Sequence, residues 1–246
     1  MAGTDEIVRT TVCLGQRDGD SWQPVGCGFL LVDQTTMWLV TCGSVLDRAK
    51  NTGLSAWVSR KGNGVLLDVQ HVLEGAGLEW LRAEQGNLAA CVVPMHPDWD
   101  IKALPSAAAL PAGQLPALLP VHGVAFPYGI DGFEPRNTLP IVLSGEIAGS
   151  DTERSRVYCD LPMLPLNEGA PLLAFAGEGA KRKLVLVGVM TGTLPISSQV
   201  PPHLVPAALA SLSMATPIHV AIDLICSPAG EAQRNKAEAA AARAVN

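Results

Sequence analysis

The chain has 246 residues, of which 48% are apolar and 16% charged, and its 23 acidic against 17 basic residues give a formal charge of -6. This composition predicts a globular protein with a sizeable core, in one large domain or two small barrels. The acidic balance and the lack of any window with the ~18 apolar residues of a membrane span exclude nucleic acid and membrane as expected partners.

The first part of the chain predicts a series of β-strands. Short runs rich in Val, Leu, Ile and Thr recur between turn residues, at 6–14, 25–33, 37–41, 54–59, 64–72 and 87–93. The Gly and Asn residues within 16–20 and 60–64 are those that hairpin turns with positive φ need. A short helical turn is expected at 45–50.

A proline-rich stretch separates this series from a second one. Residues 105–120 contain four prolines among small apolar residues, which interrupts any long helix or strand and predicts a linker. Further strands are predicted at 121–126, 138–148, 155–160, 171–176, 183–191 and 212–216. Thr216 and Pro217 have the residue types of a helix N-cap and first position, and this helix is expected to end near Ser227.

The last residues, 230–246, are Ala-rich and charged and have no apolar stripe. Their helix propensity is high, but they offer no face for packing, so they predict a frayed helix or a disordered tail.

Three stretches of the chain resemble the active-site flanks of serine peptidases. They are Gly26–Leu30 continuing to Leu39–Leu46, then Gly86–Val93, and last Leu166–Leu172. In that order they resemble the GSGF…VTAAHV, D-[IL]-A and GNSGGPL signatures of trypsin-like peptidases, particularly the bacterial HtrA-related kind. Three further stretches resemble structural turns and strands of the same family: Phe126–Gly129, Leu186–Val189 and Met214–Ile218.

The resemblance covers most of residues 7–225 and implies an all-β fold of two six-stranded antiparallel barrels with a short C-terminal helix. The implied parts are an N-terminal barrel at 1–104, an inter-barrel linker at 105–120, a C-terminal barrel plus helix at 121–229, and the charged tail at 230–246. The alternative is an unrelated all-β sandwich or barrel.

The same resemblance implies that the catalytic triad is vacant. Ser44 stands where the family has its base His, Asn87 where it has the orienting Asp, and Glu168 where it has the nucleophilic Ser. A hydroxyl cannot act as a general base near neutral pH, so no group would activate a nucleophile. Leu166 also replaces the Gly whose backbone lets amides point at the oxyanion. We expect no hydrolysis, no metal and no cofactor.

The function this implies is a pseudopeptidase that binds a protein or peptide. Expected binding residues are Glu168 and Gly169, together with the strand on which relatives add a substrate strand, here Ser211, Leu212, Ser213, Met214 and Ala215. Two alternatives stay open: an active serine or cysteine hydrolase with relocated residues, and the inert half of a larger processing peptidase, similar to the peroxisomal enzymes.

Histidines are the candidates for a relocated base. The chain has His71, His96, His122, His203 and His219. A solvated or capped role is expected for each. Because His122 lies near the start of the second barrel, it is the one placed to face the inter-barrel cleft. Asp160 is expected to be structural.

The six cysteines lack CxxC spacing and lie among apolar strand residues. They predict buried free thiols, although a Cys27–Cys42 disulfide stays open, and Cys42 is expected to be a packed strand residue. Free thiols and the lack of a visible export signal predict a cytoplasmic or other reducing compartment.

Overall fold

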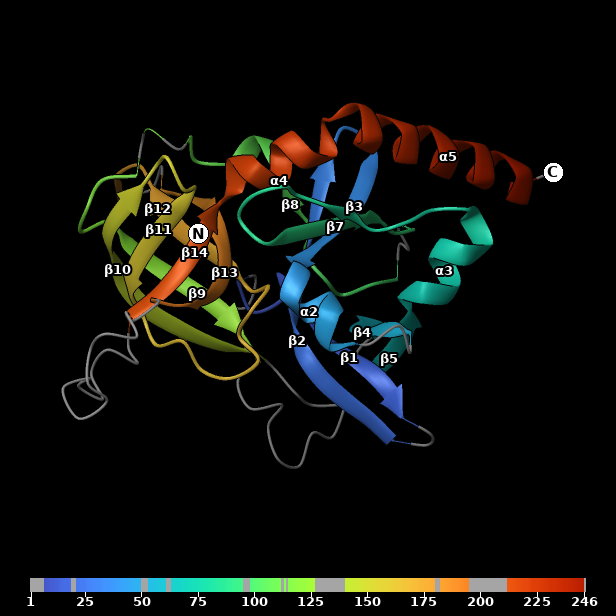
Figure 1. Cartoon of the computed structure of the whole chain (residues 1–246), viewed down its shortest axis with the longest axis horizontal. Helices are drawn as coiled ribbons and strands as arrows, with labels where there is room; N and C mark the ends of the chain where they lie inside the picture. The colour runs from blue at the N-terminus through green and yellow to red at the C-terminus, as the bar shows by residue number, and fades with distance from the viewer. Residues whose placement is uncertain are drawn as a thin grey trace.

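The computed structural model describes residues 7–18, 21–49, 53–60, 63–94, 98–111, 113, 115–126, 140–179, 182–194 and 212–245. Their strands form two sheets, one built from the N-terminal half of the chain and one from the C-terminal half (Figure 1). Two helices at the C-terminal end cross from the second sheet to the first. The expected all-β class is therefore confirmed at this level.

The N-terminal sheet is open. Its strands are β1 (Thr11–Asp18), β2 (Ser21–Asp33), β3 (Thr36–Cys42), β4 (Leu54–Arg60), β5 (Asn63–Asp68), β6 (Leu81–Arg82), β7 (Leu88–Val92) and β8 (Leu104–Pro105). They are ordered β5-β4-β1-β2-β3-β7-β6, and β8 pairs in parallel with β2. Among the described residues β5 and β6 do not pair with each other, so the closed barrel expected at 1–104 is not formed.

A helix follows the strand at one edge of this sheet. The run at 64–72 was expected to be one strand, but β5 ends at Asp68 and α3 (Val69–Ala76) follows at once. The Asp68 carboxylate accepts a hydrogen bond of 2.9 Å from the backbone amide of His71, which caps the helix. His71 therefore lies in a helix rather than at a strand end. The helical turn that was expected at 45–50 is present as α2 (Gly43–Arg48), directly after β3.

The second sheet is the closed six-stranded antiparallel barrel that the sequence predicted. Around the barrel its strands are β10 (Ile141–Asp151), β11 (Arg156–Asp160), β14 (Leu212–Pro217), β13 (Lys183–Thr193), β12 (Pro171–Ala176) and β9 (Pro120–Ala125). Val121, Ile147, Leu172 and Met190 lie in the same fully buried cluster. Between the two sheets, residues 106–108 form the short 3-10 helix η1 (Ser106–Ala108) within the proline-rich stretch.

Strand β14 has neighbours on both sides, which corrects its expected role as a binding edge. Ser213 pairs with Cys159 of β11 and with Thr193 of β13, and its side chain is buried. Met214 and Ala215 are paired in the same two ladders, and Leu212 pairs with Asp160 of β11 and accepts a hydrogen bond from the Leu194 amide. A closed barrel leaves no free edge on such a strand, so these backbone groups are not open to a peptide. Ser211 lies outside the described residues.

The C-terminal helices are α4 (Ile218–Ile225) and α5 (Pro228–Val245). Thr216, expected as the N-cap, instead lies within β14 and donates its hydroxyl to the Gly86 carbonyl at 2.6 Å, whereas Pro217 ends the strand and occupies the cap position. The short C-terminal helix is confirmed as α4. No helix within the described residues is long and apolar enough to cross a membrane.

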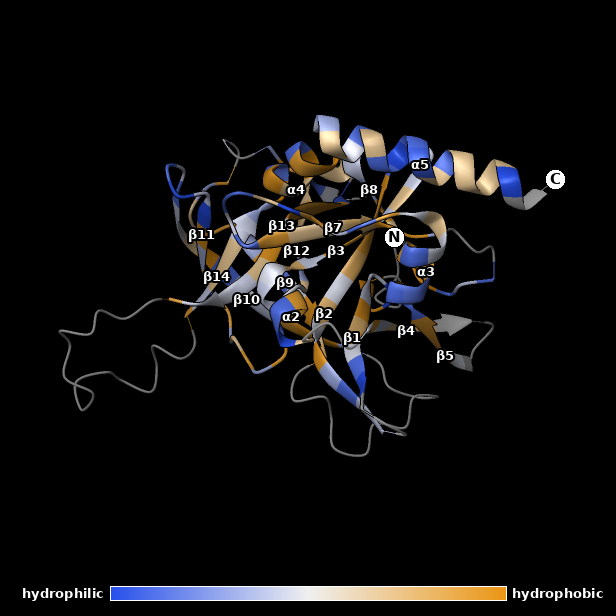
Figure 2. Cartoon of the chain, turned by 45° about the vertical axis from the view of Figure 1, so that its right-hand side comes forward, coloured by the Kyte–Doolittle hydropathy of each residue, from blue (hydrophilic) through white to orange (hydrophobic). Residues whose placement is uncertain are grey.

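Helix α5 is not a loose tail, because polar contacts fix it to the N-terminal sheet. Gln233 is buried and exchanges hydrogen bonds with Glu79, at 3.0 Å to the backbone amide and 3.2 Å to the carboxylate. Arg234 forms a 2.8 Å ion pair with Asp33, and both side chains are 14% exposed. Figure 2 shows polar and apolar residues mixed along the whole helix. The docking thus depends on specific polar contacts rather than on an apolar stripe.

Candidate functional site

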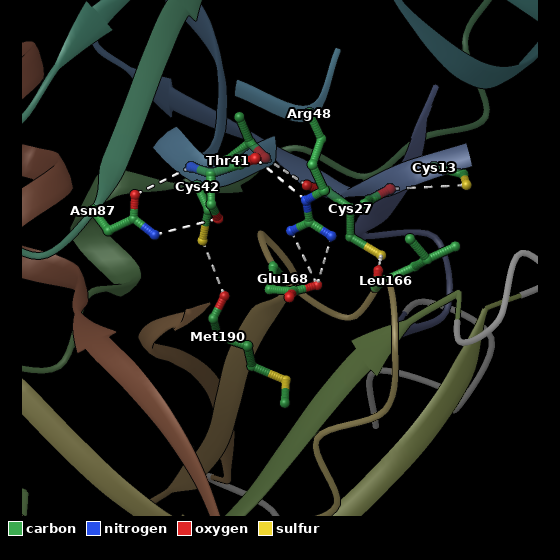
Figure 3. Close-up of polar contacts among 11 residues, drawn as sticks. Cys13, Cys27, Thr41, Cys42, Arg48, Asn87, Leu166, Glu168 and Met190 are labelled. Atoms are coloured by element: carbon green, nitrogen blue, oxygen red, sulfur yellow. Dashed lines mark hydrogen bonds and ion pairs between the residues drawn. The ribbon is translucent and has the colours of Figure 1, made fainter. Parts of the chain in front are cut away.

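Of the three positions that resemble the triad, Asn87 and Glu168 lie where the N-terminal sheet meets the barrel (Figure 3), and Ser44 is hydrogen-bonded to Asn87. The backbone amide of Cys27 in β2 donates to the Glu168 carbonyl at 2.8 Å, and the Cys42 thiol at the end of β3 donates to the Met190 carbonyl at 3.1 Å. The first contact holds the loop before β12 against β2, and the second holds β13 against the end of β3. As a result, the start of α2, the turn before β7 and the loop at 161–170 meet at one place.

Ser44 and Asn87 are direct partners. The Asn87 side-chain oxygen accepts from the Ser44 backbone amide at 3.1 Å, and its side-chain nitrogen donates to the Ser44 hydroxyl at 3.3 Å. The Asn87 carbonyl also accepts from the Gly43 amide at 2.9 Å. The turn that presents Asn87 has positive φ at Gly86 (80°) and Asn87 (54°), two residue types that tolerate this region. Neither side chain can take up a proton near neutral pH.

Glu168 is paired with a cation that sequence reasoning did not identify. Arg48 lies one helical turn after Ser44 in α2, and its two terminal nitrogens lie 3.4 and 3.3 Å from the same Glu168 oxygen, Oε2. The Arg48 Nε donates to the Ser44 carbonyl at 3.2 Å, which orients the guanidinium toward the loop. The side chains of Arg48 and Glu168 are 37% and 24% exposed, so this pair faces solvent in part.

The loop around Glu168 keeps an unusual backbone. Leu166 has a φ of 72°, a conformation that favours Gly and costs a side-chain-bearing residue about 1–2 kcal/mol. Leu166 therefore keeps the backbone turn that was expected to need a Gly at this position. Gly169 has a φ of 87°, and a Cβ there would overlap the Cys27 carbonyl oxygen. At position 169 both the positive φ and the close packing require Gly. At position 166 only the positive φ favours Gly, and Leu is present.

Asn167, between these residues, is fully buried, and neither polar atom of its side chain has a hydrogen-bond partner among the described residues. An unpaired buried amide costs about 1–3 kcal/mol. The loop therefore contains two features that cost stability, the positive φ of Leu166 and the unpaired buried side chain of Asn167.

All six cysteines are free, and five of them are buried, as the sequence predicted. Burial raises the pKa of the Cys27 thiol to about 12, and it raises that of Cys42 further. The Cys27 thiol donates to the Leu166 carbonyl at 3.2 Å, so Cys27 and Cys42 each bond a backbone carbonyl instead of one another. Cys226 is the exception to the prediction of burial, because it is exposed.

The described histidines lie on other elements than this loop. His122 on β9 contacts the Ser144 hydroxyl through Nδ1 at 2.9 Å and meets the edge of the Phe175 ring. Val121 beside it points into the barrel, so His122 lies on the outer face. Burial, with a smaller effect of the Arg182 charge, lowers the pKa of His122 below the ordinary 6.5. His219 is on α4, and His96 and His203 lie outside the described residues.

No group of three or more His, Cys, Asp or Glu side chains within the described ranges is arranged to hold a metal ion. No protein-family model and no curated protein matches the chain. The arrangement of Ser44, Asn87, Arg48 and Glu168 is therefore the basis on which its function can be argued.

Proposed function

We propose that this chain is a trypsin-like pseudopeptidase, a degenerate double-barrel domain that binds a protein or peptide without cleaving it. One observation carries the proposal: the three positions that resemble the triad are occupied by a Ser44–Asn87 amide pair and a Glu168–Arg48 ion pair. In this proposal the open N-terminal sheet is the family's first barrel with its closing pairs missing.

The proposed lack of hydrolysis follows from the chemistry of these four groups. Peptide cleavage by the family needs a base that accepts the nucleophile's proton and later returns it to the leaving amine. The Ser44 hydroxyl and the Asn87 amide have no such capacity, and the Arg48 guanidinium stays charged. The Glu168 carboxylate faces Arg48 at 3.3 Å, an arrangement that uses its charge in an ion pair.

The proposed peptide-binding edge is the end of β13. Pairing of β13 with β12 stops at Val189, whereas pairing with β14 continues to Thr193. The Leu194 amide donates to the Leu212 carbonyl of β14, and because amides alternate along a strand, the Thr193 amide points to the opposite edge. No described strand covers that edge at Thr191–Thr193. This edge replaces β14 as the place where a peptide would add a strand.

The test begins with a search for a ligand. The purified chain is panned against a random peptide library, and the selected peptide is titrated into wild type, Thr193→Pro and Thr193→Val in a calorimeter. Proline removes one edge donor and valine keeps it, so we expect at least fivefold weaker binding to Thr193→Pro alone. Equal affinity for all three proteins, or cleavage of the peptide, contradicts the proposal.

A second candidate function has one observation in its favour. The His122–Ser144 contact of 2.9 Å is a base next to a hydroxyl, which an active hydrolase with relocated residues requires. The lowered pKa of His122 keeps its imidazole neutral and able to accept a proton. A fluorophosphonate probe separates the two functions: labelling that disappears in Ser144→Ala supports the hydrolase, and absence of labelling supports the pseudopeptidase.

A further inference from the structure

An apolar pocket lies between the C-terminal helix and the N-terminal sheet, away from the candidate site. Its volume is about 370 Å³, it is partly open to solvent, and it is lined by the second half of α5, by α3, by the start of β3 and by the end of β7. Both views place α3 and α5 over that part of the sheet (Figures 1 and 2). The lining includes Met37, Val72, Ala76, Val93, Ala240 and Ala241.

Small side chains on α5 leave this space open. The first half of the helix is held by the Gln233–Glu79 and Arg234–Asp33 contacts. Its second half faces the pocket with Ala237, Ala240 and Ala241, whose methyl groups cannot fill the gap to the sheet. The polar contacts thus fix the distance between α5 and the sheet. Because the alanine side chains are too short to span this distance, a cavity remains between them.

We propose that this pocket binds an uncharged apolar small molecule, with about the bulk of two to three aromatic rings or a chain of about ten carbons. Ligand sites in proteins range from about 300 to 1,000 Å³, and an apolar cavity of about 150 Å³ is enough to hold benzene. At about 370 Å³ the pocket has room for roughly twice that volume.

The lining also selects the charge of the ligand. Among the lining residues that the structure describes, Glu238 is the one charged residue, and none is a cation that would hold a carboxylate, sulfonate or phosphate. Placing an anion beside the Glu238 carboxylate at this apolar wall is unfavourable, because like charges repel. Thr35 and Thr36 supply hydroxyls at the same wall, so a single neutral hydrogen-bonding group is compatible with the site.

The pocket is separate from the candidate peptide site. Met37 lies at the start of β3 and Cys42 at its end beside Ser44, a distance of about 17 Å along an extended strand. A change that fills the pocket therefore leaves Arg48 and Glu168 untouched.

The experiment compares two fluorophores with the same ring skeleton, the neutral N-phenyl-1-naphthylamine and the anionic 1-anilinonaphthalene-8-sulfonate. Each is titrated into the full chain, and emission and stoichiometry are recorded. We expect one neutral fluorophore bound per chain at micromolar concentration and at least tenfold weaker binding of the anionic one. Glu238→Gln should strengthen binding of the anionic fluorophore.

Variants on one helix supply the control. Ala240→Leu fills the pocket and should weaken the neutral fluorophore at least tenfold, whereas Ala239→Leu, at an exposed position of α5, should bind like wild type. If Ala240→Leu does not fold by circular dichroism, Ala76→Leu fills the pocket from α3 and replaces it. No binding by the folded wild-type chain, or equal binding by wild type and a folded filled variant, overturns the proposal.

Discussion

Arg48 and Glu168 form an ion pair of 3.3 Å between α2, which follows the N-terminal sheet, and the loop that precedes β12 of the barrel. The pair therefore links the two sheets at the point where our proposal places a family nucleophile and base. Its partial exposure and long contacts make it a weak contributor to stability, about 1 kcal/mol or less. Its effect is chemical, because it places a cation and an anion at the position that our proposal compares with a catalytic centre.

The first prediction is that Glu168→Ser alone creates no peptidase. The new hydroxyl would face Arg48 and the Ser44–Asn87 pair, none of which accepts a proton. Release of a fluorogenic peptide should stay at the buffer rate.

The triple variant Ser44→His, Asn87→Asp, Glu168→Ser supplies the base, orienter and nucleophile that our proposal finds absent, and it is expected to give weak turnover. Leu166 already holds a φ of 72°, so adding Leu166→Gly should change this turnover by less than about tenfold. Activity of the single variant would reveal another base, with His122 the first to substitute.

The second prediction concerns Gly169. An added Cβ would overlap the Cys27 carbonyl oxygen at a φ of 87°, and both groups are backbone-fixed, so Gly169→Ala should destabilise the chain by at least ~3 kcal/mol. Gly75 in α3 is the matched control, because a Cβ there meets nothing within 4 Å. Gly75→Ala should stabilise by up to ~1 kcal/mol. Urea denaturation of both variants measures these changes, and equal midpoints would contradict the loop geometry.

The third prediction is that one thiol per native chain reacts with Ellman's reagent within minutes. Cys226 is exposed, whereas the other five thiols are buried. Partial burial and the Asp33 charge raise the pKa of Cys226, with Arg234 opposing, so its reaction should be slower than that of free cysteine at pH 8 and accelerate as pH rises. Cys226→Ser should abolish the fast phase, and guanidinium should expose the remaining thiols. Two fast thiols in the native chain would contradict the described core.

Much of the fold was predictable because its strands carry local signals. Strand β12 matches the predicted run at 171–176, since apolar residues lie between turn residues at both ends. Helix α3 was missed because 64–72 was assigned as one strand. Val69, Val72 and Leu73 have the i, i+3, i+4 spacing of a helix face, and Asp68 is its cap. The closure of a sheet has no local signal, which is why the open N-terminal sheet was not predicted.

The residues of the candidate site were likewise predicted only in part. Ser44, Asn87 and Glu168 were found through flanking residues that resemble a known pattern. Arg48 was not, because its partner Glu168 lies 120 residues away and nothing in the sequence specifies that contact. The binding edge was assigned to β14 rather than β13 for a related reason: which strand of a barrel keeps a free end depends on register, which sequence alone does not fix.

The fourth prediction links His122 to the pH dependence of stability. Its pKa is lower in the folded chain than in the unfolded chain, so the unfolded state binds more protons below about pH 6.5. His122 therefore makes stability fall as pH falls through that value. In His122→Gln this part of the decline should be absent between about pH 7 and pH 5. NMR titration should place the His122 midpoint below 6.5 and shift it upward in Arg182→Gln; a midpoint above 6.5 contradicts the packing of this ring.

The last prediction concerns how Glu168 and Arg48 discriminate between charged ligands at the β13 edge. Both side chains are partly exposed and share one contact, so a peptide carrying an acidic group beside them meets attraction from Arg48 and repulsion from Glu168. Glu168→Gln removes the repulsion and should strengthen an acidic peptide, and Arg48→Gln should weaken it, each by about 1 kcal/mol or less because solvent screens the charges. For a basic peptide both signs reverse.

The matched control is the exposed Arg82–Asp47 pair, also formed by a residue of α2, where Asp47→Asn removes one negative charge without touching the loop. Calorimetry at low and high salt separates the outcomes. Affinity changes of opposite sign for Glu168→Gln and Arg48→Gln that diminish with salt place the ligand at this pair. Equal affinity changes for Glu168→Gln and Asp47→Asn would mean that only net charge matters and that the ligand binds elsewhere.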